Sequence, residues 1–177
     1  VTMKVIDWGI DEAIGRLLEE GSIDPVIVVA MENTRRRYQE YMPQRACEAF
    51  QDSPDVIAFQ NEFGNSVSDG YLQYIVDELK PFIDIAYPTL SDPAHTFIMG
   101  SSMGGLISLY ALMEYPQVFS GAGCLSTHWV AANGTVVRYL AKENCLPAPE
   151  SHKIYFDYGT LGLDAAYEPY QLEVDEL

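Results

Sequence analysis

Basic residues are scarce in this sequence. Ten Lys and Arg stand against 26 Asp and Glu, which leaves a formal net charge of −16. Such a charge repels phosphate backbones and anionic lipid surfaces, so we expect neither nucleic acid nor a membrane surface as a partner. The only strongly basic run, Arg35–Arg37, is followed by Glu40 and indicates a local feature, not a basic tail.

Cysteine and long apolar runs are equally scarce. The three cysteines, Cys47, Cys124 and Cys145, match no zinc or redox spacing, so no metal and no cofactor are expected. The longest apolar stretch, Pro25–Met31, is far too short to cross a bilayer. No signal peptide is visible, which favours a cytoplasmic location, although the chain opens on Val1 and its true start is expected to be missing.

A chain of 177 residues suffices for one domain of ordinary size. Hydrophobic residues make up 48% and charged residues 20%, which excludes a disordered, collagen-like or coiled-coil chain. We therefore expect residues 1–177 to form a single globular domain.

Apolar periodicity alternates between the helical and the extended type along the chain. Asp7 is the expected cap of a first helix that Gly21 ends, and Pro81 is expected to kink or split the helix between Ser68 and Tyr87. The expected strands are Pro25–Met31, His95–Gly100, Gly121–Leu125 and Lys153–Tyr158, and further helices are expected between Leu106 and Met113 and between Val136 and Glu143. This order predicts an α/β fold with a parallel sheet, in which the β-branched run Pro25–Met31 is a strand buried on both faces.

The motif that carries chemistry is Gly100-Ser101-Ser102-Met103-Gly104, which fits G-x-S-x-G and lies between an expected strand and an expected helix. Ser102 is the candidate nucleophile, because a serine on such a sharp turn has a strained backbone and an exposed hydroxyl. Side chains two residues to either side would collide unless they were small, which accounts for Gly100 and Gly104. The turn also aims the Met103 backbone N–H, at the positive end of the helix, toward a developing oxyanion.

This interpretation has two alternatives. A phosphate-binding loop would need a lysine after the last glycine, where Leu106 stands. Ser101 is the competing hydroxyl, but it lies one residue off the symmetric position between the glycines.

The residues around this motif resemble the esterase family of α/β hydrolases that includes esterase D, feruloyl esterases and siderophore esterases. The segments that carry the resemblance are Phe97–Tyr110, Arg36–Tyr41, Ser126–Trp129 and Asp157–Thr160. The resemblance implies an α/β-hydrolase fold, a mostly parallel sheet with helices on both faces, that is incomplete at both ends. The strands before the first helix, the loop with the second oxyanion N–H and the segment with the catalytic histidine are expected to lie outside these 177 residues.

The resemblance places the triad acid at Asp164, after the last strand. Asp157 and Glu168 are its rivals, and Asp157 is the better candidate for a structural carboxylate. No histidine follows Asp164, so the general base is not in this chain.

The chain's own histidines have other expected roles. His95 and His152 precede their strands, at the end of a parallel sheet that faces away from the site, and are expected to be surface residues. His128 follows a strand and, with Trp129, is expected to contact substrate; a structural role and a role as substitute base are the alternatives. Arg36 and Arg37 are expected to meet a substrate carboxylate or phosphate, or else to hold their loop by pairing with Glu40.

The function that these residues predict is hydrolysis of a small carboxylic ester through an acyl-enzyme on Ser102. A catalytically inactive binding module, and an acyltransferase that uses the same serine, are the alternatives. Without its flanking strands the sheet would expose its edges, so we expect poor solubility or a homodimer.

Overall fold

The computed structural model describes residues 8–143 and 145–177. The chain divides into two compact units, residues 1–32 and 33–177. In the first unit, helix α1 spans Ile10–Glu19. It ends as the sequence predicts, because Gly21 takes a left-handed φ of 67° and two bonds close the last turn, from Gly21 N–H to Leu18 O and from Ser22 N–H to Leu17 O. Asp7, the expected cap, lies outside the described residues. The expectation of a single domain stays a prediction.

The predicted strand Pro25–Met31 is wrong. Residues 24–30 have no strand assignment, and the side chains of Val26, Ile27, Val28 and Val29 are between 41% and 55% exposed. The sheet of the described residues pairs three other segments, and this run is not one of its strands. A β-branched run becomes a strand only where a partner satisfies its N–H and C=O groups.

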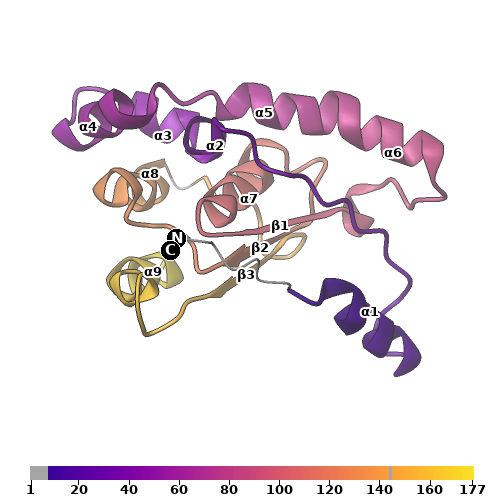
Figure 1. The fold of residues 1–177 in the computed structure, drawn as a ribbon. Coiled ribbons are helices and arrows are strands. Elements are labelled where there is room, and N and C mark those ends of the chain that lie inside the picture. The colour runs from indigo at the N-terminus through magenta and orange to yellow at the C-terminus, as the bar shows by residue number, and fades with distance from the viewer. Residues whose placement is uncertain (1–7, 144) are drawn as a thin grey trace. The chain divides into compact units, whose positions relative to one another are not determined.

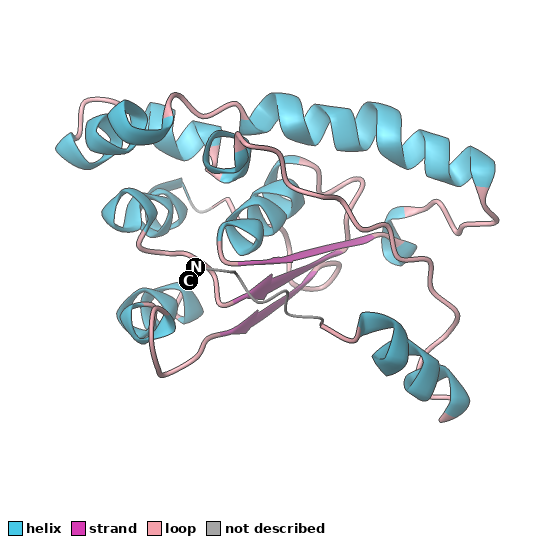
Figure 2. Cartoon of the chain, in the orientation of Figure 1, coloured by secondary structure: helices cyan, strands magenta, loops and turns pink. Residues whose placement is uncertain are grey.

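The second unit contains the predicted parallel sheet (Figures 1 and 2). Strands β1 (Phe97–Ser101), β2 (Gly121–Leu125) and β3 (Lys153–Asp157) pair in parallel in the order β1-β2-β3. His95, the expected first residue of the strand His95–Gly100, lies instead in a short 3-10 turn, Pro93–His95. The last residues of the three strands, Ser101, Leu125 and Asp157, are paired with one another in register. The carboxyl ends of the strands therefore lie at the same end of the sheet.

Helix α7 (Met103–Glu114) follows β1 and packs on β1 and β2. Most of its residues are buried on all sides, which is typical of a helix that lies between a sheet and an outer layer of helices. The other helices of the unit are α2 (Arg37–Tyr41), α3 (Gln44–Ala49), α4 (Pro54–Phe63), α5 (Ser68–Tyr74), α6 (Lys80–Ala86), α8 (Thr135–Glu143) and α9 (Glu168–Asp175). The sheet face away from α7 carries Phe97, Met99 and Tyr155, whose side chains are exposed.

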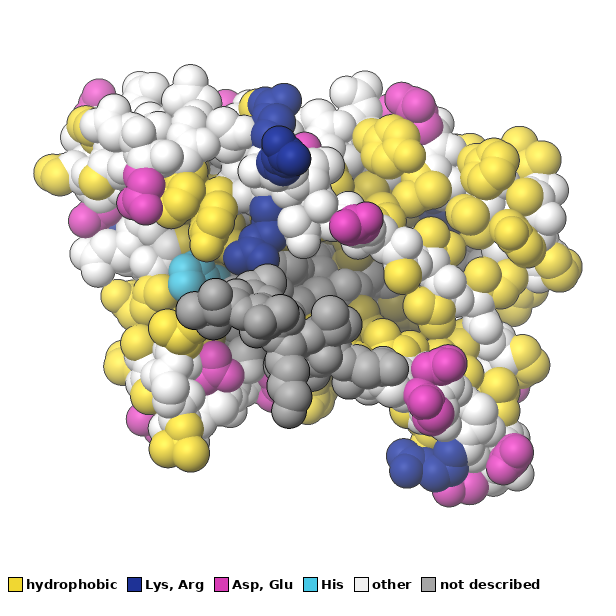
Figure 3. Space-filling model, in the orientation of Figure 1, with side chains coloured by type: hydrophobic (Ala, Val, Ile, Leu, Met, Phe, Trp, Pro, Cys, Tyr) yellow, Lys and Arg dark blue, Asp and Glu magenta, His cyan; other side chains and the backbone are white. Residues whose placement is uncertain are grey.

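Helices α5 and α6 form one continuous helical arm (Figure 1). A π-helical segment, Ile75–Leu79, joins them, and the Lys80 N–H bonds to Ile75 O, five residues back. Pro81 comes directly after this segment, and the helix continues through it as α6, so the predicted split does not occur. Instead, the hydrogen-bond pattern of the helix changes just before the proline. Hydrophobic side chains gather on the surface over α6 (Figure 3), where Phe82 and Ile85 are exposed.

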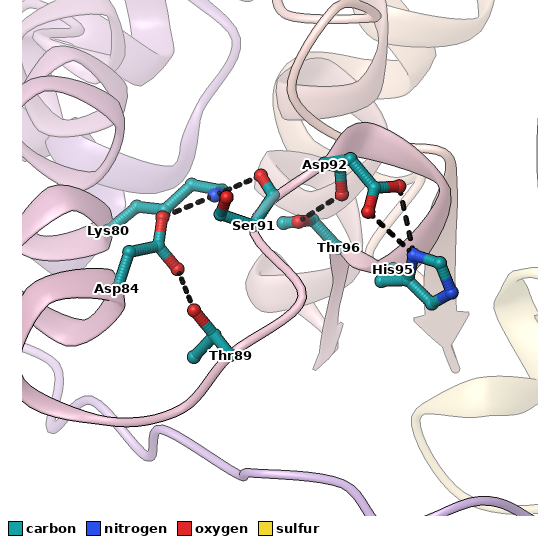
Figure 4. A network of polar contacts seen from close by, with 7 residues as sticks. All are labelled: Lys80, Asp84, Thr89, Ser91, Asp92, His95 and Thr96. Carbon is teal, nitrogen blue, oxygen red and sulfur yellow. Dashed lines mark hydrogen bonds and ion pairs between the residues drawn. The ribbon is translucent and has the colours of Figure 1, made fainter.

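A polar network fixes the connection from α6 to β1 (Figure 4). The Lys80 ammonium bonds to the Asp84 carboxylate at 2.7 Å and to Ser91 O at 2.8 Å, and the Thr89 hydroxyl donates to Asp84 at 2.7 Å. Downstream, the Asp92 carboxylate contacts His95 Nδ1 at 2.8 Å.

None of the described helices has the length and apolar character that a membrane span requires.

Candidate functional site

Ser102 occupies the sharp turn between β1 and α7. Its φ of 58° and ψ of −121° put a non-glycine residue in a region that costs about 1–3 kcal/mol. Three backbone bonds hold it there: Ser102 N–H donates to Leu125 O at 2.9 Å, and Ser102 O accepts from Gly105 N–H at 3.0 Å and from His128 N–H at 3.2 Å. Strand β2 and the loop that follows it therefore hold Ser102 in its strained backbone conformation.

The glycines of the turn have different roles. A Cβ at Gly100 would lie 2.7 Å from Gly104 O and 2.9 Å from Gly104 Cα, so Gly100 is required where two backbones meet. A Cβ at Gly104 would meet nothing within 4 Å, so the prediction that this residue must also be small to avoid a collision is wrong. Gly105 is also required for space, because a Cβ there would lie 2.6 Å from Thr127 Oγ1.

Met103 is the first residue of α7, and its side chain is fully buried in the core. The N–H groups of a first helical turn have no acceptor inside the helix and lie at its positive end. The Met103 N–H is thus suited to bind an anion beside Ser102.

A tyrosine that the sequence analysis did not single out lies beside Ser102. Tyr167 precedes α9, its side chain is only 3% exposed, and it lies close enough to Ser102 for that side chain to affect the pKa of its phenol. Burial, and then the Asp164 carboxylate, raise the pKa of the phenol, while the Ser102 side chain lowers it by a smaller amount. Tyr167 is therefore neutral at pH 7. The signal in the sequence is its spacing of three from Asp164, which places both residues on one side of a helical turn.

His128 also contacts Tyr167. Its Nδ1 is 2.7 Å from the Tyr167 hydroxyl, and the two rings meet edge to face at 5.7 Å. Burial lowers the pKa of His128, and the Arg37 guanidinium lowers it further. His128 is therefore neutral at pH 7.

The two candidate acids lie near Ser126, which has a φ of 43°. Asp164 Oδ2 accepts from the Ser126 hydroxyl at 2.8 Å and from Gly159 N–H at 3.3 Å. Asp157 Oδ1 accepts from Ser126 N–H at 2.9 Å, which is a structural contact at the end of β3. Glu168 is exposed at the start of α9. Asp164 as triad acid stays a prediction.

A pocket of about 330 Å³ opens beside His128. Tyr38, Phe59 and Phe63 line it, with Tyr38 stacked on Phe63 at 4.2 Å between ring centroids. The acidic residues at the pocket are Asp55 and Glu62. A second pocket of about 390 Å³, between Val76, Lys80 and Gln117, contains none of the predicted site residues.

The arginines occupy different positions. Arg37 is half-buried and lies over the Tyr38 ring, 5.1 Å from its centroid, close enough to His128 to affect its pKa. Arg36 is exposed and donates from Nε to Gln39 at 2.8 Å. Glu40 accepts from the Thr34 hydroxyl, and within the described chain no ion pair joins it to either arginine, so the predicted Arg–Glu pair is wrong.

Trp129 is fully buried, and its Nε1–H donates to Gln171 Oε1 at 2.8 Å. The prediction that it contacts substrate is wrong in this arrangement, because it is a core residue beneath the loop that carries His128.

His95 and His152 lie before β1 and β3, away from Ser102, as the sequence predicts. Among the residues described, no three His, Cys, Asp or Glu side chains form a group that could hold a metal ion.

A serine with positive φ between a parallel strand and the following helix is the nucleophile elbow of the α/β hydrolases, and this is the class that the fold and the turn define. Residues 2–171 match the family model described as "Putative esterase", so the chain belongs to this esterase family.

Two curated proteins of Bacillus subtilis (strain 168) are similar to the chain. The uncharacterized protein YbbA is 33% identical over 60 residues, which cover 33% of this chain and 24% of that protein. The ferri-bacillibactin esterase BesA is 28% identical over 123 residues, which cover 65% of this chain and 41% of BesA.

Among solved structures, the enterobactin esterase FES from Shigella flexneri, determined in the presence of 2,3-di-hydroxy-N-benzoyl-glycine, superposes with a TM-score of 0.59 at 18% identity. The match covers 91% of this chain and 39% of that one, and it shows the shared fold. The chain thus spans less than half the length of these relatives.

Proposed function

We propose that this protein hydrolyses carboxylic esters with Ser102 as the nucleophile. The observation that carries the proposal is the strained turn at Ser102, which the loop after β2 holds in place with two hydrogen bonds, from Ser102 N–H to Leu125 O and from His128 N–H to Ser102 O. Membership of the esterase family supports the same reaction class.

In the proposed reaction the Ser102 Oγ attacks the acyl carbon of the ester. A histidine from outside these 177 residues accepts the Ser102 proton and returns it to the leaving alcohol, and Asp164 orients that histidine. The Met103 N–H, at the start of α7, donates to the oxyanion. Water then attacks the acyl-enzyme, which releases the acid and restores Ser102.

Asp164 is supported as the acid by its position. Its Oδ2 accepts a hydrogen bond from the Ser126 hydroxyl, in the loop after β2 whose His128 N–H bonds to Ser102 O, and its carboxylate raises the pKa of the nearby Tyr167. Asp157 is tied to the Ser126 backbone instead.

The pocket beside His128 supports a substrate with a planar group. The aromatic side chains of Tyr38 and Phe63 line it, and His128 supplies a polar contact. We propose a small ester of this kind, in the class of the siderophore esters named for BesA and FES. Arg36 is placed less favourably, because its Nε is engaged by Gln39.

The test is labelling with a fluorophosphonate probe, read by mass spectrometry of the modified peptide. The full-length protein, Ser102→Ala and the neighbouring control Ser101→Ala are compared. Label on Ser102 that is lost in Ser102→Ala and kept in Ser101→Ala is the expected result. A folded full-length protein that takes no label would instead support the binding module. Product analysis with an added alcohol acceptor separates hydrolysis from acyl transfer.

A further inference from the structure

A serine that has no part in the proposed reaction lies between the nucleophile and the candidate acid. Ser126 is the residue after β2, and its φ of 43° puts a non-glycine residue in the left-handed region. The preceding residue, Leu125, accepts a hydrogen bond from Ser102 N–H at 2.9 Å, and the Ser126 hydroxyl donates to Asp164 Oδ2 at 2.8 Å. Two consecutive residues of the chain therefore contact the nucleophile and the acid.

The backbone of Ser126 is fixed independently of its hydroxyl. Its N–H donates to Asp157 O at 3.0 Å and to Asp157 Oδ1 at 2.9 Å, so the residue is tied to the end of β3. A left-handed conformation of a non-glycine residue costs free energy and persists only where its surroundings enforce it. The two acceptors of Asp157 enforce it here, and they leave the Ser126 hydroxyl to bond with Asp164.

The Asp164 carboxylate is held by one of its two oxygens. Oδ2 accepts from the Ser126 hydroxyl at 2.8 Å and from Gly159 N–H at 3.3 Å, and a Cβ at Gly159 would lie 2.8 Å from it. Within residues 8–143 and 145–177, no hydrogen bond reaches Oδ1. An ionised carboxylate accepts hydrogen bonds on both oxygens, so Oδ1 is available to the N–H of a catalytic histidine.

Resting on the proposed function, we propose that Ser126 is a positioning residue, which holds Asp164 so that the second carboxylate oxygen faces the catalytic histidine. A triad acid acts by fixing the orientation of its histidine, and displacement of a reacting group by about 1 Å can cost about 100-fold in rate. Asp164 begins a short 3-10 turn and does not lie on a strand, so its carboxylate depends on such contacts for its position.

The experiment uses the full-length protein and measures kcat and KM for p-nitrophenyl acetate, with the rate of fluorophosphonate labelling as a second readout. Ser126→Ala and Ser126→Gly both remove the hydroxyl, but only glycine suits a left-handed backbone. We expect both variants to lower kcat and the labelling rate by about 10- to 100-fold with KM within about twofold. Urea denaturation should show Ser126→Gly to be at least as stable as Ser126→Ala, so the loss of activity does not follow the loss of stability.

The matched control is Ser151→Ala. Ser151 is an exposed residue before β3, and its hydroxyl bonds to Ala148 O at 3.4 Å. This variant also removes one serine hydroxyl, but at the opposite end of the strand from Asp164, so its kcat and KM should match the wild type.

Two further variants act on the carboxylate itself. In Gly159→Ala the new methyl would lie 2.8 Å from Asp164 Oδ2, the end of a flexible side chain, so the carboxylate must move and kcat should fall as in Ser126→Ala. Asp164→Ala removes the carboxylate, so the double variant Ser126→Ala/Asp164→Ala should be no slower than Asp164→Ala alone. If Ser126→Ala did not fold, Ser126→Gly and Gly159→Ala would carry the test.

Each other outcome overturns the inference. Wild-type kcat in either Ser126 variant or in Gly159→Ala, a further loss in the double variant, or a raised KM at unchanged kcat would each do so. The proposed function fails separately, when the wild type takes no label on Ser102. Label on Ser102 and a loss of activity in Asp164→Ala, with the Ser126 variants unaffected, refute only the role of Ser126.

Discussion

The two glycines that flank the nucleophile should respond in opposite ways to the same substitution. In Gly100→Ala the new methyl would lie 2.7 Å from Gly104 O and 2.8 Å from Gly104 C, and both atoms are backbone that cannot move without shifting the start of α7. Overpacking of this kind costs about 1–3 kcal/mol of unfolding free energy. In Gly104→Ala the methyl meets nothing within 4 Å. Alanine is favoured over glycine inside a helix by about 0.5–1 kcal/mol, so this variant should match or exceed the wild type.

Urea denaturation of the full-length protein, followed by circular dichroism, measures both effects. For a protein of this size each kcal/mol corresponds to about 2–4 °C in Tm, so thermal melting gives a second reading. Equal destabilisation by the two substitutions would refute the reasoning, since it would mean that the turn needs both glycines for a reason other than space at Cβ. A neutral Gly100→Ala would show that α7 can move away from β1.

Three further predictions concern the loop after β2. Thr127 Oγ1 is buried without a hydrogen-bond partner, so Thr127→Val should raise the unfolding free energy by about 1 kcal/mol in urea denaturation, and Thr127→Ser, which keeps the hydroxyl, should not. Arg37→Gln removes a positive charge that lowers the pKa of His128, so that pKa should rise toward 6.5 in an NMR titration; an unchanged or lower value would contradict the placement of Arg37. Trp129→Phe leaves the buried Gln171 Oε1 without its donor and should cost about 1–3 kcal/mol in urea denaturation, which a second change, Gln171→Leu, should partly restore; no loss in the single variant would mean that the bond contributes nothing.

The features that could be predicted from the sequence are those that neighbours along the chain determine. The turn at Ser102 depends on a strand, a helix and small residues within five positions, and all of these are local signals. The strands β1 to β3 follow from apolar runs separated by helices, and each was predicted to within two residues at its ends. Gly104 shows the limit of this approach, because its environment depends on how α7 leaves the turn.

The features that could not be predicted depend on distant partners. The run Pro25–Met31 has the composition of a buried strand, but composition does not supply the neighbouring strand that such a segment needs. Trp129 follows His128 directly, yet only the position of Gln171, 42 residues later, decides that its ring lies in the core. Tyr167 is joined to His128 by a hydrogen bond across 39 residues, and no motif in the sequence connects them.

The π-helical segment before Pro81 has a consequence for how this region can change in evolution. The hydrogen bond from Lys80 N–H to Ile75 O reaches five residues back, where an α-helix reaches four. The segment therefore holds one residue more than an α-helix of the same rise. Deleting one residue between Ile75 and Leu79 would restore α-helical spacing and bring the proline ring against the carbonyl four residues before it. Length changes in related proteins should therefore be rare here unless the proline is replaced as well.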